Sequence, residues 1–274
     1  LVHQQTLCCQ DSLVKTRIHI PHAQLWYPHG YGQQPLYTVQ LGSKRQTFGI
    51  RTVMIEERPD EKGSAYHQKC LELQNSPSGK IYDQNEEFSG FRLLVNGIPI
   101  LCKGANWVPS EPFPSAETDQ KISSLLSLAK EAGVNMLRVW GGGIFERQHF
   151  YDECDKLGIT VTQDFLMACG HYPEELEEFI HQLRKEAAFA AYELRNHPCL
   201  VWWSGDNENA VMGSDEDETY QGRAAIHEGI MPVLSRLDPH RRFLLSSPYG
   251  GRLFASKTVG TTHNTQFMGE EICP

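Results

Sequence analysis

The sequence has neither the long apolar runs of a membrane protein nor a surplus of basic residues. None of its apolar runs approaches the roughly 20 residues that a membrane span requires. Its 25 lysines and arginines are outnumbered by 34 aspartates and glutamates, which gives a net charge of -9. Nucleic acid and anionic membranes attract basic surfaces, so we expect neither as a partner. The chain starts at Leu1 without a signal peptide or an initiator methionine, so we expect a piece of a longer protein.

Motifs for common cofactors are also missing. The eight cysteines include no C-x-x-C pair, which disfavours a zinc ribbon or a redox dithiol and fits a reducing, cytoplasmic location. Gly141-Gly142-Gly143 lacks the third glycine of a dinucleotide fingerprint and the Lys-Ser/Thr pair of a P-loop. H-E-x-x-H and G-x-S-x-G are absent, and the acidic run at residues 215–218 lacks the glycine of a calcium loop. We therefore expect no cofactor and no metal.

The first third of the chain changes character at about residue 58. Residues 1–58 contain strand-like runs, separated by prolines and glycines, which predicts part of a β-sandwich. The runs lie at 13–20, 35–41 and 51–56. Residues 59–88 are polar and lack periodicity, and we expect a linker or a surface excursion there.

Strands and helices alternate over residues 89–274. A hairpin is predicted first, with Asn96-Gly97 as its turn. Repeated strand–helix units then indicate an α/β fold with a parallel sheet. The spacing predicts a TIM (β/α)₈ barrel that is cut short near its sixth strand. The predicted strands lie near 101–106, 135–140, 159–165, 200–204, 243–246 and 258–262, and the helices near 118–132, 147–157, 174–195 and 220–237.

The run from Leu200 to Asn209 is the most informative stretch for function. Five apolar residues predict a strand buried on both faces, and a polar turn follows at once. A TIM barrel places its chemistry just past such strands. Asn207 can hold a substrate hydroxyl, and Glu208 can donate and accept a proton, as sugar hydrolysis requires. The alternative is an ordinary strand followed by a polar loop.

Polar and aromatic residues follow the other predicted strands as well. If the strand ends meet, Asn106, Trp107, Trp140, Asp164 and His263 should converge with Glu208. Amides and carboxylates bind sugar hydroxyls, and indole rings pack against sugar C–H faces. Each residue also has a structural reading: Trp140 as core, Asp164 as a helix cap, His263 as a surface histidine. The three glycines after Trp140 are interpreted as a turn that lets the backbone pass close to it.

Several segments together resemble glycoside hydrolase family 2, in particular its β-mannosidase branch. They lie at residues 25–32, 91–100, 103–107, 135–143, 163–165 and 203–209. The resemblance implies an immunoglobulin-like sandwich leading into a TIM barrel, with retaining hydrolysis of terminal β-linked sugars such as β-mannosides. Arg-Val-Trp-Gly-Gly-Gly at 138–143 is similar to both β-mannosidases and exo-β-glucosaminidases. A carbohydrate is then the expected partner.

The resemblance also implies roles for single residues. Glu208 matches the family's acid/base and Asn207 the amide that contacts the sugar 2-hydroxyl. The full site should keep Glu208 protonated by raising its pKa. The matching pocket positions are Trp107, Trp140, Asp164 and Asn106.

The chain departs from the family pattern in four places. Asp206 and Ser204 replace the usual Asn and Cys, and residues 261–264 differ from the usual sixth-strand motif. The family's nucleophile, a Glu in a Ser-Glu-Phe-Gly-like motif, has no counterpart before Pro274, since Glu270 and Glu271 lack that context. We therefore expect this piece alone to be inactive. The alternatives are an exo-β-glucosaminidase of the same family, an inactive carbohydrate-binding relic, and an α/β enzyme that does not act on sugars.

Overall fold

The computed structural model describes residues 3–6, 14–77, 79–83, 87–212, 222–251 and 254–263, and the structural statements below concern these residues. Its centre is a five-stranded parallel sheet in which strands consecutive along the chain lie side by side. This confirms the predicted α/β class and is the arrangement of part of a TIM barrel. The strands are β6 (Gly104–Trp107), β7 (Met136–Val139), β8 (Thr160–Asp164), β9 (Leu200–Ser204) and β10 (Arg242–Leu244).

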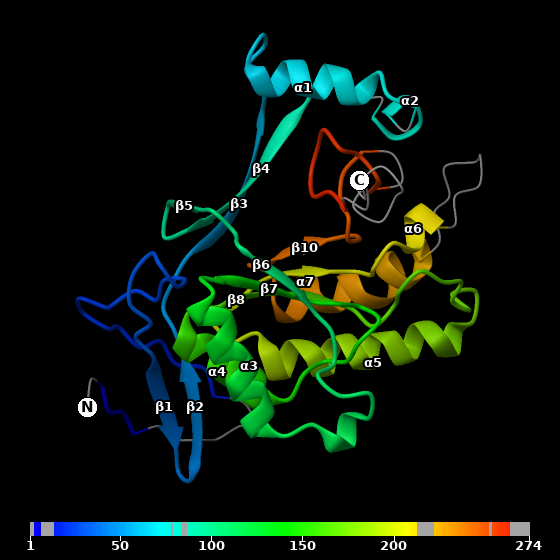
Figure 1. The fold of residues 1–274 in the computed structure, drawn as a ribbon. Coiled ribbons are helices and arrows are strands. Elements are labelled where there is room, and N and C mark those ends of the chain that lie inside the picture. The colour runs from blue at the N-terminus through cyan, green and yellow to red at the C-terminus, as the bar shows by residue number, and fades with distance from the viewer. Residues whose placement is uncertain are drawn as a thin grey trace.

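Helices connect the consecutive strands of this sheet. Figure 1 shows three of them, α3, α4 and α5, packed on one side of it. Six apolar residues of α5 recur three and four residues apart and form one stripe that is buried against the sheet. They are Ile180, Leu183, Ala187, Ala190, Ala191 and Leu194. The helices are α3 (Asp119–Glu131), α4 (Gln148–Leu157), α5 (Glu177–Leu194), the short α6 (Asn209–Met212), a π-helical segment (Ala225–Ile230) and α7 (Met231–Leu237).

Local signals in the sequence explain where the helices start and stop. The Thr118 side chain accepts a hydrogen bond from the Lys121 N–H and so caps the start of α3. Gly158 ends α4 in the left-handed conformation, with φ 77°, and returns its N–H to the Cys154 carbonyl. These signals account for the close agreement between predicted and observed bounds in this region.

An antiparallel sheet covers part of the other face. It consists of β3 (Val53–Pro59), β4 (Ser89–Val95) and β5 (Ile98–Ile100). Asn96 and Gly97 both have positive φ, as the predicted hairpin turn requires. Leu93, Val95 and Ile100 pack against Val201, Trp202 and Leu244 of the parallel sheet. The domain boundary predicted at residue 58 therefore falls inside β3, which pairs along its whole length with β4.

Residues 59–88 contain helices that the sequence pattern did not indicate. They are α1 (Ala65–Gln74), which begins with a Ser64 cap on the His67 N–H, and α2 (Gly79–Tyr82). No side chain of α1 is buried, so α1 needs no stripe of apolar residues. The helical spacing of apolar residues that predicts a helix is therefore missing from its sequence. Figure 1 shows α1 projecting away from the sheet at the end of β3 and β4.

Two predicted strands are absent from the described residues. Residues 14–20 and 258–263 form no strand. The strand predicted at 35–41 is present as β1 (Tyr37–Leu41), which pairs only with β2 (Lys44–Phe48). Val39 and Leu41 of β1 are exposed, so within the described residues no second sheet packs against these apolar side chains. The sandwich and the truncated barrel both stay predictions. No helix within the described ranges is long and apolar enough to cross a membrane.

Candidate active site

The turn that carries Asn207 and Glu208 is held from both sides beyond the ends of the strands. The Cys169 N–H donates to the Asn207 carbonyl at 2.9 Å, and the Glu208 N–H donates to the Ser247 carbonyl at 3.0 Å. Isolated bridges thus link the segments after β8, β9 and β10. Glu208 has φ 62° and Cys169 φ 47°. Such left-handed backbone is costly for residues other than glycine and clusters at functional sites.

Both carboxylate oxygens of Glu208 have partners. Oε1 lies 2.5 Å from His263 Nδ1, and Oε2 accepts the Cys169 thiol at 3.3 Å. The other ring nitrogen of His263 lies 3.0 Å from Ser247 Oγ. The structure therefore brings Glu208 and His263 together, although the strand expected before His263 is absent. The hydrogen bond from His263 lowers the pKa of Glu208, against the opposing effect of burial. This direction is opposite to the one expected for the complete site.

Arg138 connects three of the predicted site residues. Its Nη2 donates to Asp164 Oδ2 and to Asn207 Oδ1, both at 2.6 Å, and its Nη1 donates to Asn106 Oδ1 at 3.2 Å. Arg138 was not among the predicted site residues. The sequence could have indicated it, however, because an arginine within a short, partly buried strand needs partners for its charge.

Asp164 lies at the buried base of this network. Its side chain is fully buried, and it also accepts the Gly141 N–H at 3.2 Å. Burial raises the pKa of Asp164 to about 6, although the charges of Arg138 and His263 act in the opposite direction. Arg138 joins Asp164 to Asn207, the residue that precedes Glu208. Asp164 is therefore positioned by Arg138 and is not a helix cap.

Asp206 lies underneath the turn. It is fully buried, and Ser246 Oγ donates to its Oδ1 at 2.5 Å. Burial raises the pKa of Asp206 to about 7. Its side chain bonds Ser246 and its carbonyl accepts the Ser247 N–H at 2.9 Å, so Asp206 joins the turn to the segment after β10.

The two tryptophans differ from each other in placement. Trp107 is 8% exposed, packs 4.8 Å from the Phe150 ring and donates its indole N–H to Glu146 Oε1 at 2.9 Å. It faces the helix layer, which corrects its expected convergence with Glu208. Strand alternation explains this, because Asn106 points to the Arg138 side and its neighbour Trp107 must point away. Trp140 is half-buried, and its ring lies against the Gly142 backbone, where a Cβ would approach a ring carbon to 2.1 Å.

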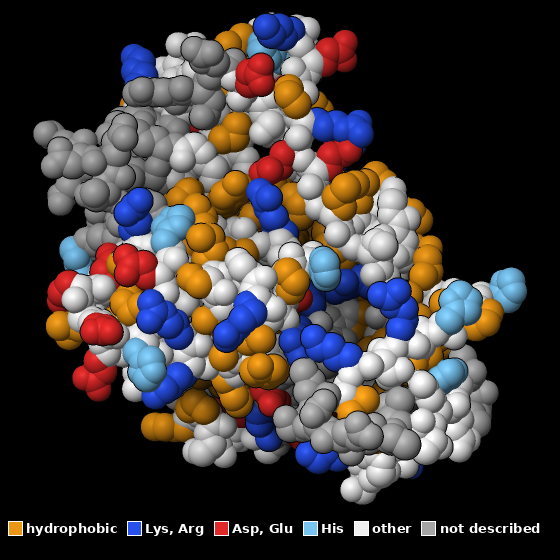
Figure 2. Space-filling view, turned by 180° about the vertical axis from the view of Figure 1, so that it is seen from behind, with side chains coloured by type: hydrophobic (Ala, Val, Ile, Leu, Met, Phe, Trp, Pro, Cys, Tyr) orange, Lys and Arg blue, Asp and Glu red, His pale blue; other side chains and the backbone are white. Residues whose placement is uncertain are grey.

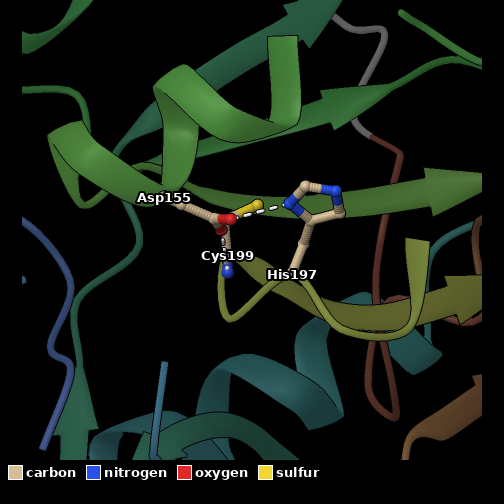
Figure 3. Close-up of side chains that lie close together, drawn as sticks. All are labelled: Asp155, His197 and Cys199. Carbon is tan, nitrogen blue, oxygen red and sulfur yellow. Dashed lines mark hydrogen bonds and ion pairs between the residues drawn. The ribbon is translucent and has the colours of Figure 1, made fainter. Parts of the chain in front are cut away.

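A buried cluster elsewhere has metal-ligand residue types. Figure 3 shows Asp155 of α4 bonded to His197 and to the backbone of Cys199, which directly precedes β9. Asp155 Oδ2 lies 2.7 Å from His197 Nδ1, and the Cys199 N–H donates to Asp155 Oδ1 at 2.9 Å. The second His197 ring nitrogen contacts Gln148 at 3.0 Å, and burial raises the pKa of the Cys199 thiol. Zinc would need a thiolate and a free ring nitrogen. The cluster is therefore complete without a metal and joins α4 to β9.

A cavity of about 710 Å³ lies near the opposite ends of β9 and β10 and is lined by four arginines. Figure 2 shows Lys and Arg side chains around a hollow on the rear face. Arg51 donates to the carbonyls of Pro198 and Leu200, and Arg241 pairs with Asp238 at 2.6 Å. These guanidinium groups bind backbone carbonyls and a carboxylate, so the cavity is unrelated to the Glu208 site.

The chain is similar in sequence to β-mannosidases. It is 33% identical to a β-mannosidase of Capra hircus over 238 residues, which are 83% of this chain and 25% of the relative. It is 30% identical to β-mannosidase B of Neosartorya fischeri over 279 residues, which are 93% of this chain and 30% of the relative. The chain thus spans between a quarter and a third of the length of these relatives. No family model matches it.

Solved structures of glycosidases have a similar fold. A β-D-mannosidase from Dictyoglomus thermophilum matches with a TM-score of 0.76 and 38% identity, over 90% of this chain and 29% of that one. An exo-chitosanase from Amycolatopsis orientalis matches with a TM-score of 0.59 and 19% identity, over 84% and 25%. A β-glucuronidase from Parabacteroides merdae matches with a TM-score of 0.58 and 21% identity, over 85% and 25%. The last two show the fold alone.

Proposed function

We propose that this chain carries the acid/base part of a retaining β-glycosidase of the glycoside hydrolase family 2 type, acting on terminal β-mannosides. The observation that carries the proposal is the meeting of Arg138 and Asp164, near the ends of β7 and β8, with Asn207 and Glu208 just past β9. His263, which follows no strand, reaches Glu208 from the segment after β10. The similarity to β-mannosidases over most of this chain supports the same reaction and the same sugar.

Glu208 is the proposed proton donor. In the first step its carboxyl group protonates the glycosidic oxygen as the bond to the leaving group breaks, and in the second step its carboxylate activates water. His263 and Cys169 hold the two oxygens of Glu208 and so restrict its rotation. A fixed donor loses less entropy on the way to the transition state.

Asn207 is the proposed contact to the sugar 2-hydroxyl. Its Oδ1 accepts from Arg138, which fixes the direction of the amide. The Nδ2 group then faces the side of Cys169 and Glu208, with a donor available for a hydroxyl. Arg138 is in turn oriented by its hydrogen bonds to Asn106 and Asp164. Trp140 is the proposed aromatic surface for the sugar.

The second carboxyl group of the retaining mechanism is proposed to come from a part of the protein outside residues 1–274. The two groups must lie roughly 5 Å apart. Asp164 is committed to Arg138, and Asp206 is buried under the turn with Ser246. A further carboxylate next to Glu208 would also raise its pKa, which the acid role requires and which His263, Cys169 and Arg138 oppose. We accordingly expect no turnover by the 274-residue chain alone.

The proposal is tested by Glu208→Gln in the full-length protein. Glutamine keeps the shape but cannot donate the proton, so cleavage of unactivated β-mannosides should fall by roughly 100-fold or more. Aryl β-mannosides with good leaving groups should retain their first step, because they need little protonation. Glu131→Gln, an exposed residue at the end of α3, is the matched control and should change neither rate.

Parallel assays on aryl β-mannoside and aryl β-glucosaminide distinguish the sugars. A preference for the glucosaminide would replace the mannosidase by an exo-β-glucosaminidase. Saturable sugar binding without turnover by the full-length protein would instead indicate a carbohydrate-binding relic. Equal loss by Glu208→Gln on good and poor leaving groups would contradict the acid/base role.

A further inference from the structure

Cys169 lies at the point where two of the proposed functional groups meet. Its thiol accepts a hydrogen bond from Asn207 Nδ2 at 3.2 Å and donates one to Glu208 Oε2 at 3.3 Å. One side chain thus contacts both the amide and the carboxylate. This role was not predictable from the residue pattern, because Cys169 lies five residues beyond β8 and outside any regular element.

Hydrogen bonds that do not involve the thiol hold the backbone of Cys169 in place. Its N–H donates to the Asn207 carbonyl at 2.9 Å, and the preceding Ala168 N–H donates to the Tyr172 hydroxyl at 2.8 Å. With φ 47°, Cys169 occupies a left-handed conformation that is unfavourable for a residue with a Cβ. The surrounding bonds maintain that conformation and aim the thiol at Glu208.

The thiol completes the set of partners around the carboxyl group. His263 binds Oε1, so Cys169 is the partner of Oε2. Burial and the adjacent Glu208 raise the pKa of the Cys169 thiol, which keeps it a protonated donor at neutral pH. A thiolate would instead repel the carboxylate and could not donate.

We infer that Cys169 is a positioning residue of the active site, whose thiol holds the carboxyl group of Glu208 and the amide of Asn207 in one fixed relation. The inference rests on the proposed function for its catalytic meaning, but the contact itself can be measured without turnover. Arg138, Asn207, Cys169, Glu208 and His263 then form one continuous chain of hydrogen bonds.

The kinetic test compares Cys169→Ala and Cys169→Ser with the wild-type full-length protein on an aryl β-mannoside. The alanine variant should lose on the order of tenfold in kcat with little change in KM, because the carboxyl group is less precisely placed. Loss of a donor to the carboxylate raises the pKa of Glu208, so the basic limb of the kcat/KM pH profile should move to higher pH. Serine keeps a donor and should restore the position of the limb.

Cys70→Ala is the matched control. The Cys70 thiol likewise donates to a carboxylate, Asp60 Oδ2 at 3.6 Å, but lies at α1, far along the chain from the site. It should leave kcat, KM and the pH profile unchanged. A Cys169→Ala variant that matches Cys70→Ala in all three quantities would overturn the inference.

A second measurement does not depend on activity. The iodoacetamide reaction of Cys169 at fixed pH should become severalfold faster in Glu208→Gln, since the carboxylate no longer raises the pKa of the thiol. The rate at Cys102 should not change. An unchanged rate at Cys169 would overturn the inference even in an active enzyme. Acceleration in a protein that hydrolyses no β-glycoside would support the contact while the proposed function fails.

Discussion

At the scale of single residues, burial raises the pKa of a carboxyl group, whereas hydrogen-bond donors lower it. Glu208 has two hydrogen-bond donors and a lowered pKa, whereas Asp164, Asp206 and Glu146 are buried and have raised pKa values. Of these four carboxyl groups, the proposed acid is thus the one whose pKa is lowered, although its role requires a raised pKa. A neighbouring carboxylate from elsewhere in the protein is the simplest physical remedy.

Glu146 provides a test of this reasoning on stability. Burial, helped by the neighbouring Glu117, raises its pKa to about 7 from an ordinary value of 4.5, while Trp107 opposes the shift. Between these two pH values the folded state therefore holds a proton that the unfolded state releases. Its contribution to the free energy of unfolding is complete below pH 4.5 and is lost as the pH rises through 7.

Glu146→Gln stays neutral and can still accept the Trp107 N–H. The free energy of unfolding of the variant, minus that of the wild type, should therefore increase as the pH rises from 4.5 through 7. At pH 8 this difference should exceed its value at pH 4.5 by roughly 1–3 kcal/mol. Chemical denaturation at pH 4.5 and pH 8 measures the difference. A stability difference that is the same at both pH values would show that Glu146 ionises normally in the folded protein.

At the scale of elements, the buried Asp155–His197–Cys199 cluster joins a helix to the central strand of the site. Asp155→Ala leaves the His197 ring and the Cys199 N–H without their partner in a dry environment. The cost should be about 3–5 kcal/mol, as for a broken buried pair. Thermal unfolding should show it as a large fall in Tm, with Asp152→Ala on the same helix as the control. A fall no larger than the control's would contradict the structural role of the cluster.

Prediction from sequence succeeded where an element carries its own signal. β9, with five buried residues in a row, was predicted with its observed bounds, and α3 and α5 were predicted from their apolar stripes. It failed for α1, whose side chains are all unburied, and for the strands expected at 13–20 and 258–262. Alternating residues form a strand only when another strand is there to pair with, and a short sequence window does not contain that information.

The candidate site was predictable in part for a similar reason. Glu208, Asn207, Asp164 and Asn106 could be expected to meet, because parallel strands end at one edge. His263 also contacts Glu208, but the strand expected before it is absent, so the strand-end argument does not explain its place. Arg138 was missed because its contacts depend on the direction of its side chain in β7. Cys169 was missed because its contacts depend on the conformation of the loop after β8. Trp107 was misplaced because a one-residue step along a strand reverses the direction of the side chain.

At the scale of the whole chain, an excess of acidic residues accompanies a polar site at one edge of a parallel sheet. A net charge of -9 suits a neutral sugar, which needs no electrostatic attraction, better than an anionic ligand. Helices cover one face of the sheet, and the β3–β4–β5 sheet covers part of the other. Such a scaffold holds the strand ends rigidly, which is what the proposed acid/base and its positioning residues require.

The central claim is that Glu208 is the acid/base of a retaining glycosidase, and its most direct test is the product formed by Glu208→Ala in azide. The full-length variant, given an aryl β-mannoside with a good leaving group, should form a glycosyl-enzyme that water releases slowly. Azide needs no general base, so it should restore turnover and yield the β-mannosyl azide, identified by NMR. Failure of azide to accelerate turnover, or a product of α configuration, would contradict the account.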